Sequence, residues 1–283
     1  MDTNWDLGFS ARPLLLGREI FVGEWRCPGG VLDAAGEVTR HVELGLQREG
    51  AHLRAIGRER RLVDVTTATL NAVGDEYRMS VPEPCPQRAT AIVLRGALAE
   101  ELVPRVSARF VPISADAALL HGQLLQASDR LAVEERALAL LGRVLSDAGR
   151  RAEPAPEPSP ARRALAEQAQ HLLATRYAER LTIESLAAAC GSSPFHLSRV
   201  FTAVTGQTIH RQLTRIRLRM ALLRLAGSAG RLTELALAVG FSSHSHFTDA
   251  FRREFGCAPS VQALASAAHR QKLGSRTLQR FRG

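Results

Sequence analysis

The most constraining feature of this sequence is an internal repeat in its last 100 or so residues. Gly191, Phe201 and Gly206 recur, at an offset of 49 to 50 residues, as Gly240, Phe251 and Gly256. In each copy, the spacing of apolar residues predicts a short helix, a glycine turn and a second helix with one polar face. A two-helix unit cannot bury its apolar side alone, so the copies must share a core with neighbouring helices.

The residues around the repeat also show helical spacing. Ser159 and Pro160 are typical of a helix start. Between the two copies, segment 208–226 carries apolar residues on one stripe and arginines elsewhere, which predicts a rigid connecting helix. We therefore expect an all-helical domain over 161–265, in which a long helix joins two helix-turn-helix motifs.

A proline-rich segment separates this region from the first half of the chain. Residues 153–160 read EPAPEPSP, which favours an extended linker. Before it, residues 18–110 show short stretches of alternating polarity between turn residues, and these predict a small antiparallel barrel or sandwich. Residues 116–148 then predict two antiparallel helices. The expected fold is thus α+β with two domains, 1–152 and 161–265, followed by a basic tail over 266–283.

The charge is concentrated in the second half. Residues 161–283 hold 18 Lys and Arg against 6 Asp and Glu, a net of +12, while residues 1–160 hold 19 against 22. This indicates a polyanionic partner, and nucleic acid fits better than an anionic membrane. No apolar run approaches the roughly 18 residues that span a bilayer, and the first residues lack a signal-peptide pattern. With four widely spaced cysteines, we expect a cytoplasmic protein with reduced thiols.

A helix-turn-helix motif places its second helix in the major groove of DNA. The small residues Ala187 and Ala236 occupy equivalent places in the two copies and allow the paired helices to cross closely. Two such helices on one rigid connector would read two major-groove segments about 10 base pairs apart. Double-stranded DNA is therefore the expected partner, and a helical bundle without a DNA role is the alternative.

Two segments, SSPFHLSRVFTAVTGQT and AVGFSSHSHFTDAFRREFGCAPS, closely resemble the recognition segments of the AraC/XylS family of bacterial transcription regulators. The match covers about residues 160–265, although VQALA after Ser260 departs from the family pattern. Residues 71–77, NAVGDEY, resemble a loop of the cupin-like effector or dimerisation domain in that family. The resemblance implies promoter DNA and RNA polymerase as partners, together with a small-molecule effector and a homodimer.

The resemblance places DNA contacts on the second helix of each motif. Arg199 is the leading candidate for a bidentate contact to guanine and Phe195 for a thymine methyl, with a phosphate contact and a core position as their alternatives. Asp249 either accepts from a cytosine amino group or repels the backbone. The expected base contacts are Phe195, Ser198, Arg199, His244, Ser245, Thr248 and Asp249. The expected phosphate contacts, with solvated helix faces as the alternative, are Ser193, His196, Thr202, Arg211, Arg215, Arg252 and Arg253.

Metal chemistry is considered because cupin-like barrels often bind a metal through two histidines two residues apart. Here the strand reads His41-Val42-Glu43 and His52 stands alone, so no metal, cofactor or enzymatic activity is expected. The expected role of the barrel is a ligand pocket or a dimer surface. The candidate effector contacts are Trp25, His41, Arg54 and Tyr77.

Together these features predict a sequence-specific, DNA-binding transcription regulator. Two alternatives remain. A barrel-type metal enzyme with an accessory DNA-binding domain would hold stoichiometric metal. An architectural DNA binder would show a specificity ratio near one against random duplex, where a regulator shows roughly 10³ or more.

Overall fold

The computed structural model describes residues 10–29, 32–33, 36–81, 83–102, 106, 108–127, 129–150, 158–225, 228 and 230–264. Most of the expected linker and the whole basic tail lie outside the described residues. The elements of the first half are β1 (Ser10–Leu16), β2 (Ile20–Cys27), β3 (Leu32–Asp33), β4 (Glu37–Val38), β5 (Val42–Glu49), β6 (His52–Ile56), β7 (Glu59–Val63), β8 (Thr67–Asn71), β9 (Glu76–Val81), β10 (Gln87–Leu94), α1 (Gly96–Leu102), β11 (Phe110–Pro112), α2 (Ala115–Leu124) and α3 (Arg130–Ala148).

The first half contains two antiparallel sheets. One has the order β1-β2-β10-β5-β8-β11, and the other has the order β3-β9-β6-β7 with β4 also paired to β9. Alternation along β5 gives the larger sheet two distinct faces, because Val42 and Leu44 are buried in the core while Glu43, Gly45 and Gln47 line a cavity. The predicted antiparallel β-rich half is confirmed, whereas closure into a barrel stays a prediction.

Two helices pack beside the larger sheet, as the periodicity of residues 116–148 predicts. The side chains of Ser114 and Asp129 cap α2 and α3 by accepting from the backbone N–H groups of Ala117 and Ala132. The predicted apolar stripe of α3 is buried; it consists of Val133, Ala137, Leu140, Leu141 and Val144. These helices place the sheet between a helical layer and the cavity.

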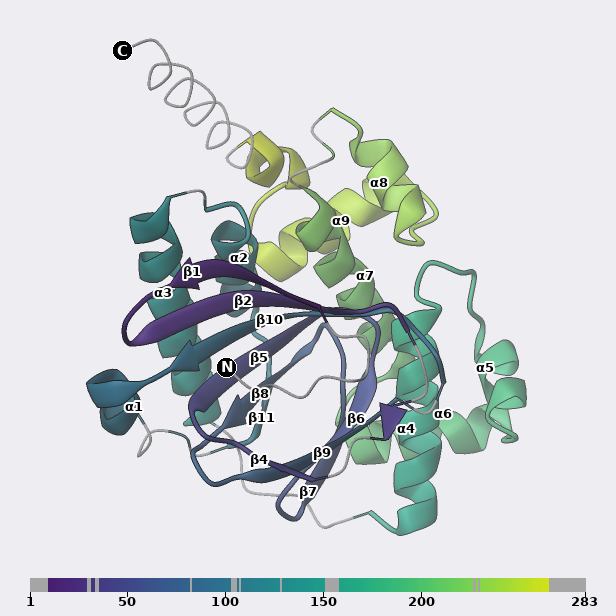
Figure 1. The fold of residues 1–283 in the computed structure, drawn as a ribbon. Coiled ribbons are helices and arrows are strands. Elements are labelled where there is room, and N and C mark those ends of the chain that lie inside the picture. The colour runs from purple at the N-terminus through teal and green to yellow at the C-terminus, as the bar shows by residue number, and fades with distance from the viewer. Residues whose placement is uncertain are drawn as a thin grey trace.

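The second half is helical, as predicted. Its elements are α4 (Pro160–Thr175), α5 (Ile183–Ala189), α6 (Pro194–Thr205), α7 (Ile209–Leu225), α8 (Leu232–Ala238) and α9 (His244–Phe255). The long helix α7 lies between α4 to α6 on one side and α8 and α9 on the other (Figure 1). Phe201, Phe247 and Phe251 are fully buried and form the centres of the two motifs. The motifs therefore share a core through α7.

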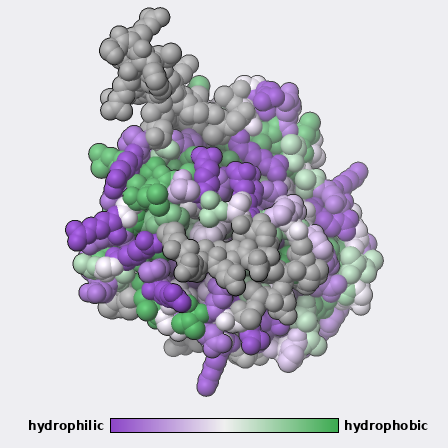
Figure 2. Space-filling view, viewed as in Figure 1, coloured by the Kyte–Doolittle hydropathy of each residue, from purple (hydrophilic) through white to green (hydrophobic). Residues whose placement is uncertain are grey.

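The helical half contacts the β-rich half along three helices. α4 lies against β7, and α7 and α9 lie against α2. Arg60 and Glu167 form an ion pair of 3.0 Å across the α4 contact. On the face shown in Figure 2, hydrophilic side chains gather over α9 and the adjoining part of α7. The Arg60–Glu167 ion pair and an apolar core that extends through both halves therefore hold the two halves together.

Candidate nucleic-acid interface

The first helix-turn-helix motif consists of α5 and α6. The side chains of Thr182 and Ser185 form a reciprocal capping box at the start of α5. The Ser193 side chain caps α6 by accepting from the backbone N–H of His196, and α6 ends at Gly206 with a φ of 73°. Local signals in the sequence therefore fix both ends of this second helix.

In the second motif, formed by α8 and α9, helix α9 repeats the cap and the end of α6, whereas α8 begins after Arg231 without a side-chain cap. Ser243 caps α9 by accepting from the N–H of His246, and α9 ends at Gly256 with a φ of 75°. The turns contain Gly191 and Gly240, with φ values of 59° and 92°. Ala187 and Ala236 are buried where the paired helices cross. The sequence repeat therefore reproduces the glycine turns and both ends of the second helix, as well as the apolar residues.

The two turns differ in their surroundings. A Cβ atom at Gly191 would meet no atom within 4 Å, but one at Gly240 would lie 2.7 Å from the Tyr177 carbonyl oxygen and 2.8 Å from Nε of Arg217. Arg217 donates to the carbonyl oxygens of Tyr177 and Glu179, at 2.8 and 2.9 Å. The turn of the second motif is therefore packed against α7 and the segment after α4.

The outer face of α6 is exposed. The Phe195 side chain is 77% exposed, which excludes the core position considered for it. Cζ of Arg199 lies 5.9 Å from the centre of the Phe195 ring, within reach of a cation–π contact. Ser193, His196, Ser198 and Thr202 are also exposed. This face is free to contact a ligand.

The outer face of α9 is exposed as well. Its exposed residues are His244, Ser245, Asp249, Arg252 and Arg253, and Thr248 is partly exposed. The corresponding positions of α6 are all exposed. The hydroxyl of Thr248 lies 3.3 Å from Nε2 of His244. His246 packs its ring edge-on against Phe241, with centroids 5.3 Å apart, at the border of the core.

The two arginines predicted as phosphate contacts on α7 have different surroundings. Arg211 is exposed. Arg215 instead faces the β-rich half and donates to the carbonyl oxygen of Ile113 at 3.1 Å. No local pattern in the sequence predicts this contact, because it joins residues 102 positions apart. The available signal was a polar face on α7, with Gln212, Arg215 and Arg219 three and four positions apart.

A cavity of about 180 Å³ lies within the β-rich half, and three of the four candidate effector contacts line it. These three are Trp25, Arg54 and Tyr77. Cζ of Arg54 lies 4.1 Å from the centre of the Tyr77 ring, and the Tyr77 hydroxyl donates to Glu37 at 2.5 Å. The fourth candidate, His41, is exposed and is not among the lining residues.

His52 lines the same cavity, although no local pattern in the sequence indicates this position. It is buried, and its Nε2 has no hydrogen-bond partner among the described residues. Burial, with the charge of Arg54, lowers its pKa to about 3, so the ring is neutral near pH 7. A buried ring nitrogen without a partner is a polar group that a ligand in the cavity could satisfy.

The described residues contain no cluster of three or more His, Cys, Asp or Glu side chains arranged to bind a metal ion. Among them, too, no helix combines the length and apolar character that a membrane span requires.

Comparison with known proteins identifies the helical half. A family model described as a helix-turn-helix domain matches residues 186–262. AdaA of Bacillus subtilis, named as a bifunctional transcriptional activator and DNA repair enzyme, is 30% identical over 30% of this chain and 40% of its own. The transcriptional activator RclR of Escherichia coli is 37% identical over 28% of each chain. The activator RhaS of Escherichia fergusonii is 37% identical over 31% of this chain and 33% of its own.

Solved structures include similar chains. A transcriptional regulator with an AraC-type DNA-binding domain from Chromobacterium violaceum is 26% identical, over 37% of this chain and 93% of its own, with a TM-score of 0.34. ToxT of Vibrio cholerae is 9% identical, over 87% and 98%, with a TM-score of 0.35.

The C-terminal half therefore contains a helix-turn-helix DNA-binding domain. This domain is of the AraC/XylS type, as the resemblance of its recognition segments predicts. The chain spans less than half the length of the curated relatives it matches. The likeness of the first half to a cupin stays a prediction.

Proposed function

We propose that this protein is a sequence-specific transcription regulator that reads two adjacent major-groove segments with α6 and α9. The observation that carries the proposal is the pair of exposed polar faces on two helices with matching caps, in the part of the chain with a net charge of +12. The positive charge draws the domain to DNA, and the exposed side chains read base edges. The residues 1–152 and 161–265 act as separate regulatory and DNA-binding domains.

Base reading falls to side chains on the outer faces of both helices. On α6, Arg199 donates two hydrogen bonds to guanine while Phe195 contacts a thymine methyl. The cation–π contact between these two residues favours one arrangement of the Arg199 side chain before DNA arrives. Ser198 contributes on the same helix. On α9 the reading residues are His244, Ser245, Thr248 and Asp249.

Phosphate contacts fix the orientation of the domain on the duplex. The proposed residues that are exposed on α6, α7 and α9 are Ser193, His196, Thr202, Arg211, Arg252 and Arg253. Arg215 joins them only if α7 leaves the β-rich half, because its guanidinium now faces the Ile113 carbonyl oxygen.

The β-rich half supplies control by a small molecule in its cavity. Trp25 and Tyr77 offer aromatic surfaces there, and Arg54 and His52 offer polar groups. Nε2 of His52 and Nε of Arg54, both buried and without a hydrogen-bond partner among the described residues, support ligand binding in this cavity. His41 is not part of this proposed site. RNA polymerase and a second copy of the chain complete the proposed partners, in line with the named activity of the relatives.

Selection from a pool of random duplexes by the full chain tests the proposal. A regulator enriches a defined sequence with two half-sites about 10 base pairs apart and binds it roughly 10³-fold more tightly than random duplex. A ratio near one would instead favour an architectural role without sequence preference.

Repeating this selection with Arg199→Ala tests the role of that residue. We expect preference to relax at one base position, at a cost of about 1–3 kcal/mol for the cognate base. Arg58→Ala, which removes an exposed charge from the β-rich half, is the matched control and should leave the selected sequence unchanged. Uniform weakening on all sequences would make Arg199 a phosphate contact.

A further inference from the structure

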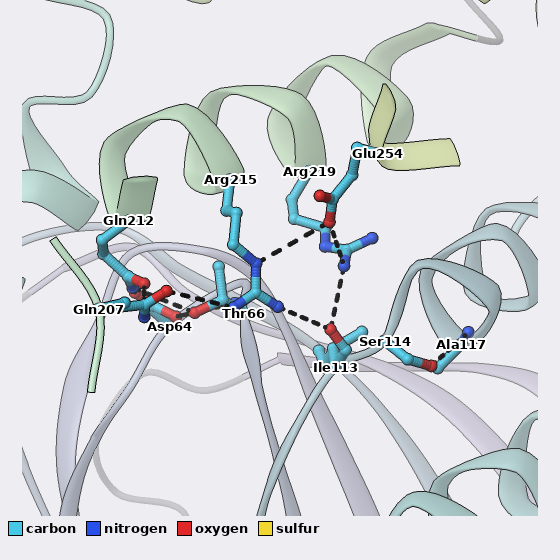
Figure 3. Close-up of polar contacts among 10 residues, drawn as sticks. All are labelled: Asp64, Thr66, Ile113, Ser114, Ala117, Gln207, Gln212, Arg215, Arg219 and Glu254. Carbon is cyan, nitrogen blue, oxygen red and sulfur yellow. Dashed lines mark hydrogen bonds and ion pairs between the residues drawn. The ribbon is translucent and has the colours of Figure 1, made fainter. Parts of the chain in front are cut away.

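One face of α7 holds the helical half against the β-rich half. Gln212, Arg215 and Arg219 all point from this face toward the loops that follow β7 and β11 (Figure 3). Gln212 and Arg219 are 1% and 3% exposed. We define these side chains with their partners Asp64, Thr66, Ile113 and Glu254 as the α7 junction.

The first part of the α7 junction surrounds a buried carboxylate. Nε2 of Gln212 donates to Asp64 Oδ2 and to the Thr66 hydroxyl, both at 3.2 Å. Asp64 also accepts from the backbone N–H and hydroxyl of Thr66, at 2.8 and 2.6 Å. Burial raises the pKa of Asp64, against the effect of these donors and of the Arg215 charge. The carboxylate is therefore held mainly by neutral donors, an arrangement of limited stability.

The second part surrounds a buried cation. Arg215 and Arg219 both donate to the Ile113 carbonyl oxygen, at 3.1 and 3.0 Å. Arg219 also lies 3.2 Å from the Glu254 carboxylate, while its Nε and Nη1 have no hydrogen-bond partner among the described residues. Burial lowers the pKa of Arg219 to about 10 although Glu254 opposes this change. Because its buried donors are only partly satisfied, the contact is specific but not strong.

The α7 junction occupies groups that the proposed function needs. Arg215 cannot contact a phosphate while its guanidinium faces Ile113 and Glu254. Glu254 belongs to α9, so the same contacts also fix the second recognition helix relative to the β-rich half. Contact with the β-rich half and contact with DNA therefore compete for the same side chain of α7, Arg215.

We propose that the α7 junction is a latch that restrains the DNA-binding helices in a docked state of low DNA affinity. Opening it frees Arg215 for a phosphate and lets α7 and α9 adjust to the duplex. This inference rests on the proposed DNA-binding function. In a two-state equilibrium, the apparent dissociation constant falls in proportion as the open fraction rises.

Gln212→Glu in the full chain tests the latch. The change keeps the side-chain shape but sets two carboxylates against each other at the 3.2 Å contact, so it should open the junction. The double variant Asp64→Asn/Gln212→Glu exchanges amide and carboxylate across the contact and should close it again. Gln123→Glu, at an exposed position of α2, is the control for added negative charge.

Each protein is measured at pH 8 in two assays. Small-angle X-ray scattering reports the radius of gyration, and fluorescence anisotropy reports affinity for a labelled 30-base-pair duplex of random sequence at fixed salt. We expect Gln212→Glu to be larger and to bind about tenfold more tightly, which corresponds to about 1.4 kcal/mol, despite its extra negative charge. The double variant should resemble the original chain, and the control should bind slightly more weakly.

The outcomes separate the latch from the function it rests on. An unchanged radius for Gln212→Glu, or a larger radius without tighter binding, would overturn the latch. So would a double variant as expanded as the single one. If none of the four proteins binds duplex, the proposed DNA-binding function fails, while the scattering arm still shows whether the α7 junction holds the halves together.

Discussion

Replacement of Gly240 by alanine should destabilise this protein far more than the same change at Gly191. Both glycines have positive φ, at which a non-glycine residue costs about 1–2 kcal/mol. At Gly191 no other penalty applies, because a Cβ atom would meet nothing within 4 Å. At Gly240 the new Cβ would lie 2.7 Å from a backbone oxygen, and relief of such overlap typically costs about 1–3 kcal/mol.

The Gly240 change also affects Arg217. Displacing its guanidinium weakens two hydrogen bonds to the Tyr177 and Glu179 carbonyl oxygens, and a bond from a charged donor is worth about 1.5–3 kcal/mol. With one such bond lost, Gly240→Ala should lower the free energy of unfolding by about 3.5–8 kcal/mol, against about 1–2 kcal/mol for Gly191→Ala.

Urea unfolding followed by circular dichroism measures both variants under the same conditions. Equal losses of stability would show that the packing of the second turn against α7 contributes nothing, and would refute this reasoning.

Two further predictions concern stability. Burial lowers the pKa of His52 and His121 to about 3, so both rings are neutral when folded and gain a proton below about pH 6.5 when unfolded. The unfolding free energy should therefore be unaffected by these rings above pH 6.5 and fall by about 1.4 kcal/mol per pH unit for each ring as the pH drops toward 3. Urea unfolding at pH 7, 6 and 5 should show this fall, and the slope should be shallower in His121→Gln by the contribution of one ring; an unchanged slope in that variant would contradict the prediction. Ser193→Ala and Ser243→Ala should each cost about 1 kcal/mol by removing a helix cap, and the exposed Ser242→Ala should cost little in the same assay; equal effects of all three would exclude a capping role.

The helical domain could be predicted largely from the sequence because its signals are local. Caps such as Ser193 and Ser243 act within three residues, and the apolar spacing of α6 and α9 sets which faces are exposed. The edge strand β1 was missed because Pro13 lies at an irregularity in its pairing with β2. β11 was missed because it has three residues.

Long-range contacts account for the remaining differences at the candidate sites. Gln212 and Asp64 are 148 positions apart, so no local pattern indicates that they meet. The lining of the cavity could not be predicted from local patterns for the same reason. His41 and His52 are both single histidines in a β-rich segment, and only the packing of the two sheets makes one exposed and the other part of the cavity wall.

The position of α7 has a consequence for how a signal would be transmitted. The same helix sets the distance between the two motifs and carries the side chains that form hydrogen bonds to the β-rich half. A displacement of this helix would therefore move both proposed recognition helices, α6 and α9, in a single event. Regulation through it would be concerted, with neither half of an operator gained or lost before the other.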